Sequence, residues 1–488
     1  MAKICFASTT RRTNTRMISR RSFLSIGGGL LAQAPAPPNI VLILCDDLGY
    51  GDVGAYYSEA KIPTPHMDKL AREGMRFTDA HSPSSVCTPT RYGVLTGRYC
   101  WRTRLKSGVG GGYSPALIEP GRDTIASLLK RTKNYRTGGF GKWHLGLGTA
   151  EKVDYSRKFS PSPNDYGFDE FFGIPASLDM PPYVFIENHR AVEPPTATIG
   201  DSGEVKRGPF WRGGPRSPSF QMDDVIPAIV KRACAFVEKE KGPFFAYVPL
   251  PAPHTPWVPS RPFKGKSKVG LYGDFVEETD ASIGMILASL ERSGKAGNTL
   301  VIVTSDNGAP WEERDARETG GHWANAKWRG QKADIQEAGH RIPFMVRWPG
   351  RVKPGTVSDQ TICLTDIFAT IAQVQGIPMT EKMGEDSVSI LPVLEGRQKG
   401  PLREAVVHHS ANGLFSIRQG NWKLILGHGS GGFTEPVKRE ARPGEAAGEL
   451  FNLRRDPHED RNVYDANPAI VARMTALLKK YQDSGSSR

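Results

Sequence analysis

Two uninterrupted apolar runs, each ending in acidic residues, constrain the fold most strongly. The run over residues 39–45 (NIVLILC) ends at Asp46 and Asp47, and the run over 299–304 (TLVIVT) is followed by Ser305, Asp306 and Asn307. A continuous apolar run of this length is typical of a central strand that is covered on both faces. We therefore predict both runs as inner strands of one sheet, with acidic groups at their carboxyl ends.

Further strands and helices alternate along the chain. Strands are predicted at 244–248 and 342–348, and helical patterns occur at 65–73, 123–130, 226–239 and 275–291. This alternation predicts an α/β architecture. Open α/β sheets place their sites beyond the carboxyl ends of the strands, which is where the acidic pairs lie.

The pattern changes near residue 401. Short strands are predicted at 405–409, 414–418 and 422–426, with a helix at 468–482. We expect three parts: a leader and linker over 1–38, a catalytic domain over 39–400, and a small α+β domain with antiparallel strands over 401–488. The Gly-, Pro- and Arg-rich stretch 188–220 is predicted as a long loop that lines a cleft.

Net charge, hydropathy and cysteine spacing restrict the ligands and the kinds of site that this chain can have. The 488 residues carry a formal charge of +13, and residues 1–34 hold six Lys and Arg but no acid, so +7 remains without them. A basic surface attracts polyanions such as nucleic acid or sulfated glycans, but no nucleic-acid-binding signature occurs. No apolar run approaches the roughly 18 residues of a membrane span. The six cysteines form no C-x-x-C pair, which disfavours a zinc site or a dense disulfide framework.

The N-terminus predicts export. Arg20 and Arg21 precede Phe23-Leu24 and a short, Gly-rich apolar stretch, which resembles a twin-arginine signal. The protein is therefore expected in the periplasm or outside the cell, with Met17 as an alternative start. A basic tail without a targeting role is the other interpretation, and the prolines after Gln33 leave the cleavage site open.

The segment Cys87-Thr-Pro-Thr-Arg91 predicts an anion site at a helix start. Thr88 before Pro89 suggests an N-cap, with a helix that ends at Gly97. Cys87 would then lie at the helix N-terminus, where free N–H groups favour an anion. Arg91 is four residues further on and reaches the same face. The alternative is an ordinary buried cysteine.

The acidic pairs form an all-oxygen ligand set. Asp46, Asp47, Asp306 and Asn307 offer carboxylate and amide oxygens, which suit Ca²⁺ or Mg²⁺, whereas zinc usually recruits His or Cys. The alternative is a pair of unrelated polar turns.

Three further segments carry candidate residues. They are Gly139–Gly146 (GFGKWHLG) with Lys142 and His144, Pro253–Pro256 with His254, and Trp328–Lys332 (WRGQK) with Lys332. Lys142 and His144 are two residues apart and would point the same way in an extended segment. His322 lies between two of these motifs and is predicted to line the substrate pocket. His408 and His409 are predicted as packing residues. Four tryptophans fall in predicted loops and are candidates for stacking on sugars: Trp211, Trp257, Trp311 and Trp323.

Together these motifs, over residues 39–350, resemble the type I formylglycine-dependent sulfatases, which are arylsulfatase-like members of the alkaline phosphatase superfamily. Thr90 departs from the Ser or Ala usual at its position. The resemblance implies an alkaline-phosphatase-like core with a central mixed, mainly parallel sheet between helices. It implies that a maturation enzyme oxidises Cys87 to formylglycine. It also implies that calcium, or magnesium, is held by Asp46, Asp47, residue 87, Asp306 and Asn307.

The resemblance also implies roles for the remaining residues. Catalysis would involve Cys87, Arg91, Lys142, His144, His254 and Lys332, and substrate would contact Lys142, His254, Lys332 and His322. Asp306 would take a proton from the hydrated formylglycine, His254 would protonate the leaving alcohol, and His144 would assist the second step. The substrate would be a sulfated carbohydrate or an aryl sulfate. A phosphodiesterase or phosphonate hydrolase of the same superfamily, and an inactive glycan-binding protein, are the alternatives.

Overall fold

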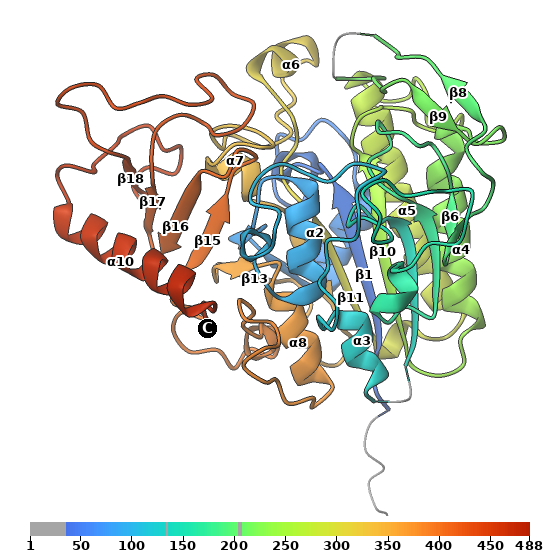
Figure 1. Ribbon diagram of the computed structural model, residues 1–488. Coiled ribbons are helices and arrows are strands. Elements are labelled where there is room, and N and C mark those ends of the chain that lie inside the picture. Colours follow the sequence, from blue (N-terminus) through green and yellow to red (C-terminus); the bar gives the residue numbers. More distant parts are fainter. Residues whose placement is uncertain (1–35, 133–134, 204–206) are drawn as a thin grey trace, which may run out of the picture. The chain divides into compact units, whose positions relative to one another are not determined.

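A computed structural model describes residues 36–132, 135–203 and 207–488 (Figure 1). The predicted twin-arginine leader lies outside the described residues. Residues 37–488 form one compact unit. Within the described ranges, no helix is both long and apolar enough to cross a membrane.

A ten-stranded sheet forms the centre of the described chain, in the order β13-β2-β12-β11-β1-β10-β4-β5-β6-β7. Strands β11, β1, β10, β4 and β5 run parallel, whereas β12 is antiparallel to β11. The sheet is therefore mixed and mainly parallel, as predicted. Its strands are β1 (Asn39–Asp46), β2 (Met75–Phe77), β4 (Arg136–Lys142), β5 (Glu170–Ile174), β6 (Ile186–Glu187), β7 (Arg190–Ala191), β10 (Phe244–Pro253), β11 (Thr299–Ser305), β12 (Phe344–Arg347) and β13 (Thr356–Ser358).

Strand β1 shows why its sequence is continuously apolar. It lies between β10 and β11, and all eight of its residues are buried. Ile40, Leu42 and Leu44 pack into the core on one face of the sheet. The alternate residues Val41, Ile43 and Cys45 pack into the core on the other face. Both faces of the strand are covered, so neither has room for polar side chains.

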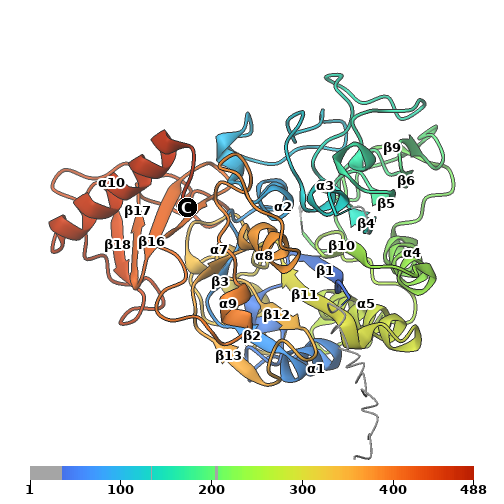
Figure 2. The same cartoon turned by 90° about the horizontal axis from the view of Figure 1, so that it is seen from below.

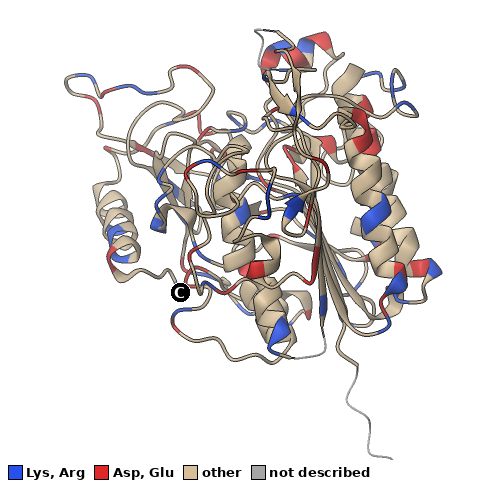
Figure 3. Cartoon of the chain, turned by 45° about the vertical axis from the view of Figure 1, so that its right-hand side comes forward, with Lys and Arg blue, Asp and Glu red and all other residues tan. Residues whose placement is uncertain are grey.

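Helices cover both faces of the sheet (Figure 2). One layer contains α1 (Pro65–Glu73), α4 (Val225–Lys239) and α5 (Gly270–Arg292), and the other contains α2 (Cys87–Thr96), α3 (Ile125–Lys130), α8 (Asp366–Val374) and α9 (Leu391–Leu394). The central strands are mostly uncharged along their length, and charged residues are concentrated on helices and loops (Figure 3). On the central strands β1, β4 and β11, the charged residues lie at the strand ends, such as Asp46 and Lys142.

A second, antiparallel sheet has the order β15-β16-β17-β18 and packs against helix α10. Its elements are β15 (Val406–His409), β16 (Phe415–Gln419), β17 (Trp422–Ile425), β18 (Glu449–Asn452) and α10 (Pro468–Ser484). The predicted antiparallel C-terminal strands are confirmed. The domain boundary at residue 400 stays a prediction.

The remaining connections carry short elements. The predicted loop 188–220 contains β7, β8 (Ala197–Ile199) and β9 (Gly214–Arg216), so it is more regular than expected. Its Gly and Pro content concealed these strands, which are only two or three residues long. The other short elements are β3 (Ala80–His81), β14 (Ile362–Cys363), α6 (Glu313–Glu318) and α7 (Glu337–His340).

Candidate active site

The acidic pairs meet at the carboxyl ends of β1 and β11. The two strands are paired in parallel up to Cys45 and Ser305, so the residues that follow both strands lie together. The backbone N–H of Asp47 donates to Asp306 Oδ1 at 3.2 Å, and Asn307 Nδ2 donates to Asp47 Oδ1 at 2.6 Å. Asp46, Asp306 and Asn307 are 0% exposed.

Helix α2 places Cys87 beside these acids. The helix begins at Cys87 itself, its N-cap is Val86, and it ends at Gly97 in the left-handed conformation. The prediction that Thr88 caps the helix was therefore wrong. The Thr88 hydroxyl instead accepts a hydrogen bond from the backbone of Gly110 at 3.1 Å. Cys87 Sγ lies 3.5 Å from Asp46 Oδ1.

Three buried cations surround the carboxylates. Arg91 NH2 donates to Asp306 Oδ2 at 2.7 Å and lies 3.5 Å from Asp46. Lys142 Nζ donates to Asp46 Oδ2 at 2.6 Å. Lys332 Nζ donates to Asp47 Oδ2 at 2.9 Å. The predicted residues of three separate motifs therefore converge on one buried cluster.

The donor set fits a hard cation. Three carboxylates and one amide lie within the cluster, and Asn307 Oδ1 is buried without a hydrogen-bond partner among the described residues. The amide nitrogen of Asn307 donates to Asp47 Oδ1 and to the Gly308 carbonyl, which leaves the amide oxygen as the unused acceptor. Ligand atoms of Asp46, Asp47, Cys87 and His254 all lie within 4.8 Å of one another. Oxygen ligands of this kind suit Ca²⁺ or Mg²⁺.

The charges of the cluster shift its titrations. Burial alone would raise the pKa of Asp46, but Lys142, His254 and Arg91 hold it well below its usual value. Burial and the nearby Asp46 carboxylate raise the pKa of Asp306 to about 7. Burial raises the pKa of the Cys87 thiol to about 12. An unmodified Cys87 is therefore a protonated thiol, which is a poor nucleophile.

His144 lines the cavity and has one ring nitrogen without a hydrogen-bond partner among the described residues. Its Nε2 lies 2.7 Å from the carbonyl oxygen of Gly110 and must carry the proton, because a carbonyl only accepts. Burial and the charges of Lys142 and Arg91 hold its pKa well below the usual value, so the ring is neutral. Nδ1 is then an unprotonated acceptor, and it has no hydrogen-bond partner among the described residues. His144 has a φ of 55°, so the expected extended segment is broken at this residue.

His254 has the opposite orientation. Its Nδ1 lies 2.5 Å from the Thr255 carbonyl oxygen and must carry a proton for the same reason. Its Nε2 lies 3.7 Å from Asp47 Oδ2. The side chain of His254 lines the cavity.

A cavity of about 720 Å³ opens onto the cluster. Its wall includes Cys87, His144, His254 and Lys332. Segments remote in sequence complete the wall, with Arg207 and Arg212 from the 188–220 region and Ala411, Gly432 and Phe433 from the C-terminal part of the chain. The prediction that residues 188–220 line a cleft is confirmed for these two arginines.

His322 does not reach this cavity. Its side chain is fully buried, Nε2 lies 2.8 Å from Asp52 Oδ1, and Nδ1 accepts from the backbone of Lys61 at 3.3 Å. Both ring nitrogens are therefore engaged inside the protein. The expectation that His322 contacts substrate was wrong, because both of its ring nitrogens are engaged and it does not line the cavity. Its partner Asp52 lies 270 residues away in sequence, so no local pattern could show this pairing.

Two of the four tryptophans in the predicted loops have contrasting positions. Trp257 lines the cavity. Trp311 is 5% exposed and packs on Tyr272 with ring centroids 4.6 Å apart. Among these tryptophans, Trp257 is placed to contact a ligand, and Trp311 is a packing residue.

Two cavity-lining residues were missed by the sequence analysis. Ser177 and Asp179 follow strand β5 and line the cavity close to His144. The rule that identified Asp46 applies to them as well, because they are polar residues just beyond a parallel strand. Strand β5 was not among the predicted strands, so the position of Ser177 and Asp179 beyond a strand end could not be recognised from the sequence.

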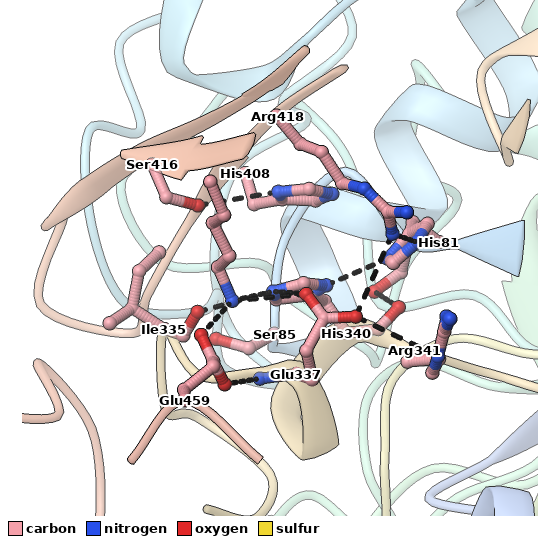
Figure 4. A network of polar contacts seen from close by, with 12 residues as sticks. His81, Ser85, Ile335, Glu337, His340, Arg341, His408, Ser416, Arg418 and Glu459 are labelled. Atoms are coloured by element: carbon pink, nitrogen blue, oxygen red, sulfur yellow. Dashed lines mark hydrogen bonds and ion pairs between the residues drawn. The ribbon is translucent and has the colours of Figure 1, made fainter. Parts of the chain in front are cut away.

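A second buried polar cluster joins the catalytic part to the C-terminal sheet (Figure 4). His81 Nδ1 and His340 Nδ1 are 3.0 Å apart, and the rings of His340 and His408 stack at 3.8 Å. Lys423 Nζ contacts Glu337 at 3.1 Å and Glu459 at 2.8 Å. Three further charged groups complete this histidine cluster, namely Asp79, Arg341 and Arg418. His408 and His409 are buried, which confirms their prediction as packing residues.

Comparisons with known proteins agree with this geometry. Residues 38–377 match the sulfatase family model, and residues 328–484 match the model described as N-sulphoglucosamine sulphohydrolase, C-terminal. An N-acetylgalactosamine-6-O-sulfatase of Bacteroides thetaiotaomicron is 35% identical, over 92% of this chain and 93% of the relative. Human arylsulfatase A is 31% identical, over 95% of this chain and 90% of the relative.

Solved structures show the same fold. A protein of the Bacteroides thetaiotaomicron locus for the metabolism of multiple glycosaminoglycans aligns with a TM-score of 0.82 and 32% identity, covering 91% of this chain and 99% of the other. The phosphonate monoester hydrolase of Agrobacterium radiobacter aligns with a TM-score of 0.60 at 19% identity, covering 92% and 96%, which shows a shared fold alone. The fold is the alkaline-phosphatase-like α/β core. The chain belongs to the sulfatase family and is a sulfuric ester hydrolase.

Proposed function

We propose that this protein is a formylglycine-dependent, calcium-containing sulfatase of sulfated carbohydrates. The observation that carries the proposal is the position of Cys87. It begins a buried helix, lies among three carboxylates and three cations, and forms part of the wall of a 720 Å³ cavity. The mature residue would supply a geminal hydroxyl as nucleophile, and the metal would polarise that hydroxyl and the sulfate.

Asp46, Asp47, Asp306 and Asn307 would hold the metal. Their oxygens converge, and Asn307 Oδ1 lacks another partner among the described residues. A metal held by these carboxylates would leave the ammonium groups of Lys142 and Lys332, which now contact Asp46 and Asp47, to bind sulfate oxygens. Arg91 keeps its contact with Asp306 and orients it. These preorganised cations would stabilise the charge that develops on the sulfuryl group.

The two histidines divide the proton transfers. His144 is neutral with a bare Nδ1, so it is suited to accept a proton from residue 87. His254 carries a proton on Nδ1 and places Nε2 3.7 Å from Asp47 Oδ2, in a side chain that lines the cavity. It is therefore suited to donate to the oxygen of the leaving alcohol. Asp306 is the proposed acceptor for the proton of the attacking hydroxyl.

Two findings support a carbohydrate substrate. A relative that is 35% identical is named for a sulfated amino sugar. The cavity of this chain is lined by hydroxyl, carboxylate and guanidinium groups, together with the Trp257 ring, and sugars are bound by such mixtures of polar groups and aromatic faces. A phosphonate or phosphate ester hydrolase remains the alternative, because that activity occurs on the same fold.

Two measurements test the proposal. Mass spectrometry of the peptide that contains residues 87–91 should find formylglycine when the protein is produced together with a maturation enzyme. The matured enzyme should release sulfate from a defined set of sulfated oligosaccharides faster than it hydrolyses matched phosphate or phosphonate esters. An active enzyme with only an unmodified thiol, or a preference for phosphonates, would contradict the proposal.

Export through the twin-arginine route is part of the same proposal. It is supported by Arg20 and Arg21 in the leader sequence. Replacing both by Lys should retain the precursor in the cytoplasm, as cell fractionation would show. Export at the wild-type rate would contradict this assignment.

A further inference from the structure

The turn after β5 places two polar side chains in the cavity wall. Ser177 and Asp179 line the cavity, while Leu178 between them packs into the core with helices α4 and α5. Ser177 is 2% exposed and Asp179 is 4% exposed. The turn therefore presents its polar side chains to the cavity and its apolar side chain to the core.

Each of these side chains has an unused polar atom. Within the described part of the chain, Ser177 Oγ and Asp179 Oδ1 are buried and have no hydrogen-bond partner. A buried acceptor or hydroxyl without a partner costs free energy, and most such groups in folded proteins are satisfied. Two of them, separated by one residue in a cavity wall, indicate that a bound ligand completes their hydrogen bonds.

The other oxygen of Asp179 is held in place. Arg212 NH1 donates to Asp179 Oδ2, and the Arg212 backbone N–H donates to the Asp179 carbonyl at 3.1 Å. The hydroxyl of Tyr183 donates to the same carbonyl at 3.0 Å. A fixed cation therefore engages one carboxylate oxygen and leaves the second one free, which sets the direction in which Asp179 accepts.

The turn is also tied to the catalytic residues. The backbone N–H of Trp143 donates to Ile174 at 3.0 Å, and that of His144 donates to Pro175 at 3.0 Å. These bonds connect the start of the turn to the segment that carries Lys142 and His144. A ligand group bound by Asp179 is therefore held at a fixed place relative to the reacting sulfate.

We propose that Asp179 and Ser177 bind one hydroxyl of the sulfated sugar ring and that Arg212 positions Asp179 for this contact. The proposal rests on the proposed function, because it takes a sulfated carbohydrate as the ligand of the cavity. A sugar hydroxyl donates to Asp179 Oδ1 and accepts from Ser177 Oγ. A simple aryl sulfate has no such hydroxyl, so the pair discriminates in favour of sugar sulfates.

The first test compares a sugar sulfate with 4-nitrophenyl sulfate. Asp179→Ala should lower kcat/KM for the sugar sulfate by about 10- to 100-fold, since a hydrogen bond to a charged group is lost. Its kcat/KM for the aryl sulfate should stay within about 3-fold of wild type, which also shows that the variant is folded. Ser177→Ala should show a weaker form of the same selectivity. Asp201→Asn, an exposed aspartate of the neighbouring loop, is the matched control and should change neither substrate.

The second test varies the substrate. One monodeoxy analogue of the sugar sulfate should lose about 10- to 100-fold in kcat/KM with wild-type enzyme, and this loss should vanish in Asp179→Ala. Arg212→Ala should lower the sugar-sulfate constant by a smaller factor and have no further effect in the Asp179→Ala background.

The outcomes separate the two proposals. If wild-type enzyme releases no sulfate from any sugar, the proposed function fails. If it does release sulfate, but Asp179→Ala slows both substrate types equally or keeps the full deoxy penalty, the role of Asp179 is wrong and the proposed function stands.

Discussion

The protein contains two buried clusters of charged and polar groups, and they differ in what their atoms face. The catalytic cluster around Cys87 opens onto a cavity and leaves ligand-facing atoms of Asn307 and His144 unpaired among the described residues. The histidine cluster around His340 lies between the catalytic part and the C-terminal sheet (Figure 4). Its members Asp79 and Arg418 line a separate cavity, whereas the rings of His81, His340 and His408 lie in the wall of neither cavity. Buried charge and unpaired polar atoms are common to both clusters, since Glu337 Oε2 and His408 Nε2 also lack a hydrogen-bond partner among the described residues. What marks the reactive cluster is a candidate nucleophile, Cys87, in the wall of its cavity.

The largest effect should come from the nucleophile. Cys87→Ala should reduce sulfate release by at least about 10⁴-fold, because the attacking group is lost. Its free energy of unfolding should change by about 1 kcal/mol or less, since only one sulfur atom is removed. Single-turnover assays and urea denaturation measure the two quantities. Residual turnover above one per cent would remove Cys87 from the catalytic cluster.

The proposed metal ligands should come next. Asp306→Ala should lose stoichiometric Ca²⁺ or Mg²⁺, because it removes a charged ligand, and its activity should fall accordingly. Asp52→Asn is the matched control, since Asp52 is an equally buried acid that binds His322 instead, and it should retain the metal. Elemental analysis of the purified proteins decides between them. Stoichiometric zinc in the active wild type would contradict the oxygen-ligand assignment.

Substitutions in the histidine cluster should lower the free energy of unfolding and leave kcat nearly unchanged. Lys423→Met leaves Glu337 and Glu459 without their shared cation, so the free energy of unfolding should fall by about 3–5 kcal/mol. The kcat of the folded variant should stay within about 3-fold of wild type. Lys438→Met, at a side chain that is 85% exposed, should change stability by about 0.5 kcal/mol or less. A variant of Lys423 that is stable but inactive would reverse the assignment of the two clusters.

The smallest effect concerns acid stability. Burial holds the pKa of His81, His340 and His408 below the ordinary value of 6.5. The neutral rings stabilise the fold above pH 6.5, and this contribution is lost as the pH falls below 6.5 toward the folded-state pKa values. His408→Phe keeps the stacking and removes one proton site. It should flatten the pH dependence of unfolding below pH 6 by about 1.4 kcal/mol per pH unit. His458→Gln, at an exposed histidine, should leave the slope unchanged.

Residues that lie next to a regular element could be predicted from the sequence. The apolar runs identified β1 and β11, and the acids that follow them meet because parallel strands end at the same edge. Helix α1 has the predicted bounds, Pro65–Glu73. These features depend on local patterns, so a single sequence contains them.

Residues whose role depends on distant partners could not be predicted. His81 and His340 are 259 residues apart, so no spacing indicated that they meet. Thr88 has the chemistry of a cap, but Gly110 competes for its hydroxyl. Asp179 lies in a turn, where aspartate is common. Its role depends on Arg212, which binds one carboxylate oxygen and leaves the other unpaired among the described residues, and the sequence does not show this contact.

Backbone hydrogen bonds from the C-terminal part of the chain complete the surroundings of Cys87 late in synthesis. Ser85 N–H donates to the His409 carbonyl at 3.2 Å, and Ala411 N–H donates to Ala333 at 2.9 Å. The backbone just before Cys87 and just after Lys332 is therefore completed by the last part of the chain to be synthesised. At about 5–20 residues per second, His409 leaves the ribosome roughly 16–64 s after Cys87. Throughout that interval Cys87 lacks these backbone contacts, and the proposed maturation enzyme would reach residue 87 before the C-terminal sheet covers it.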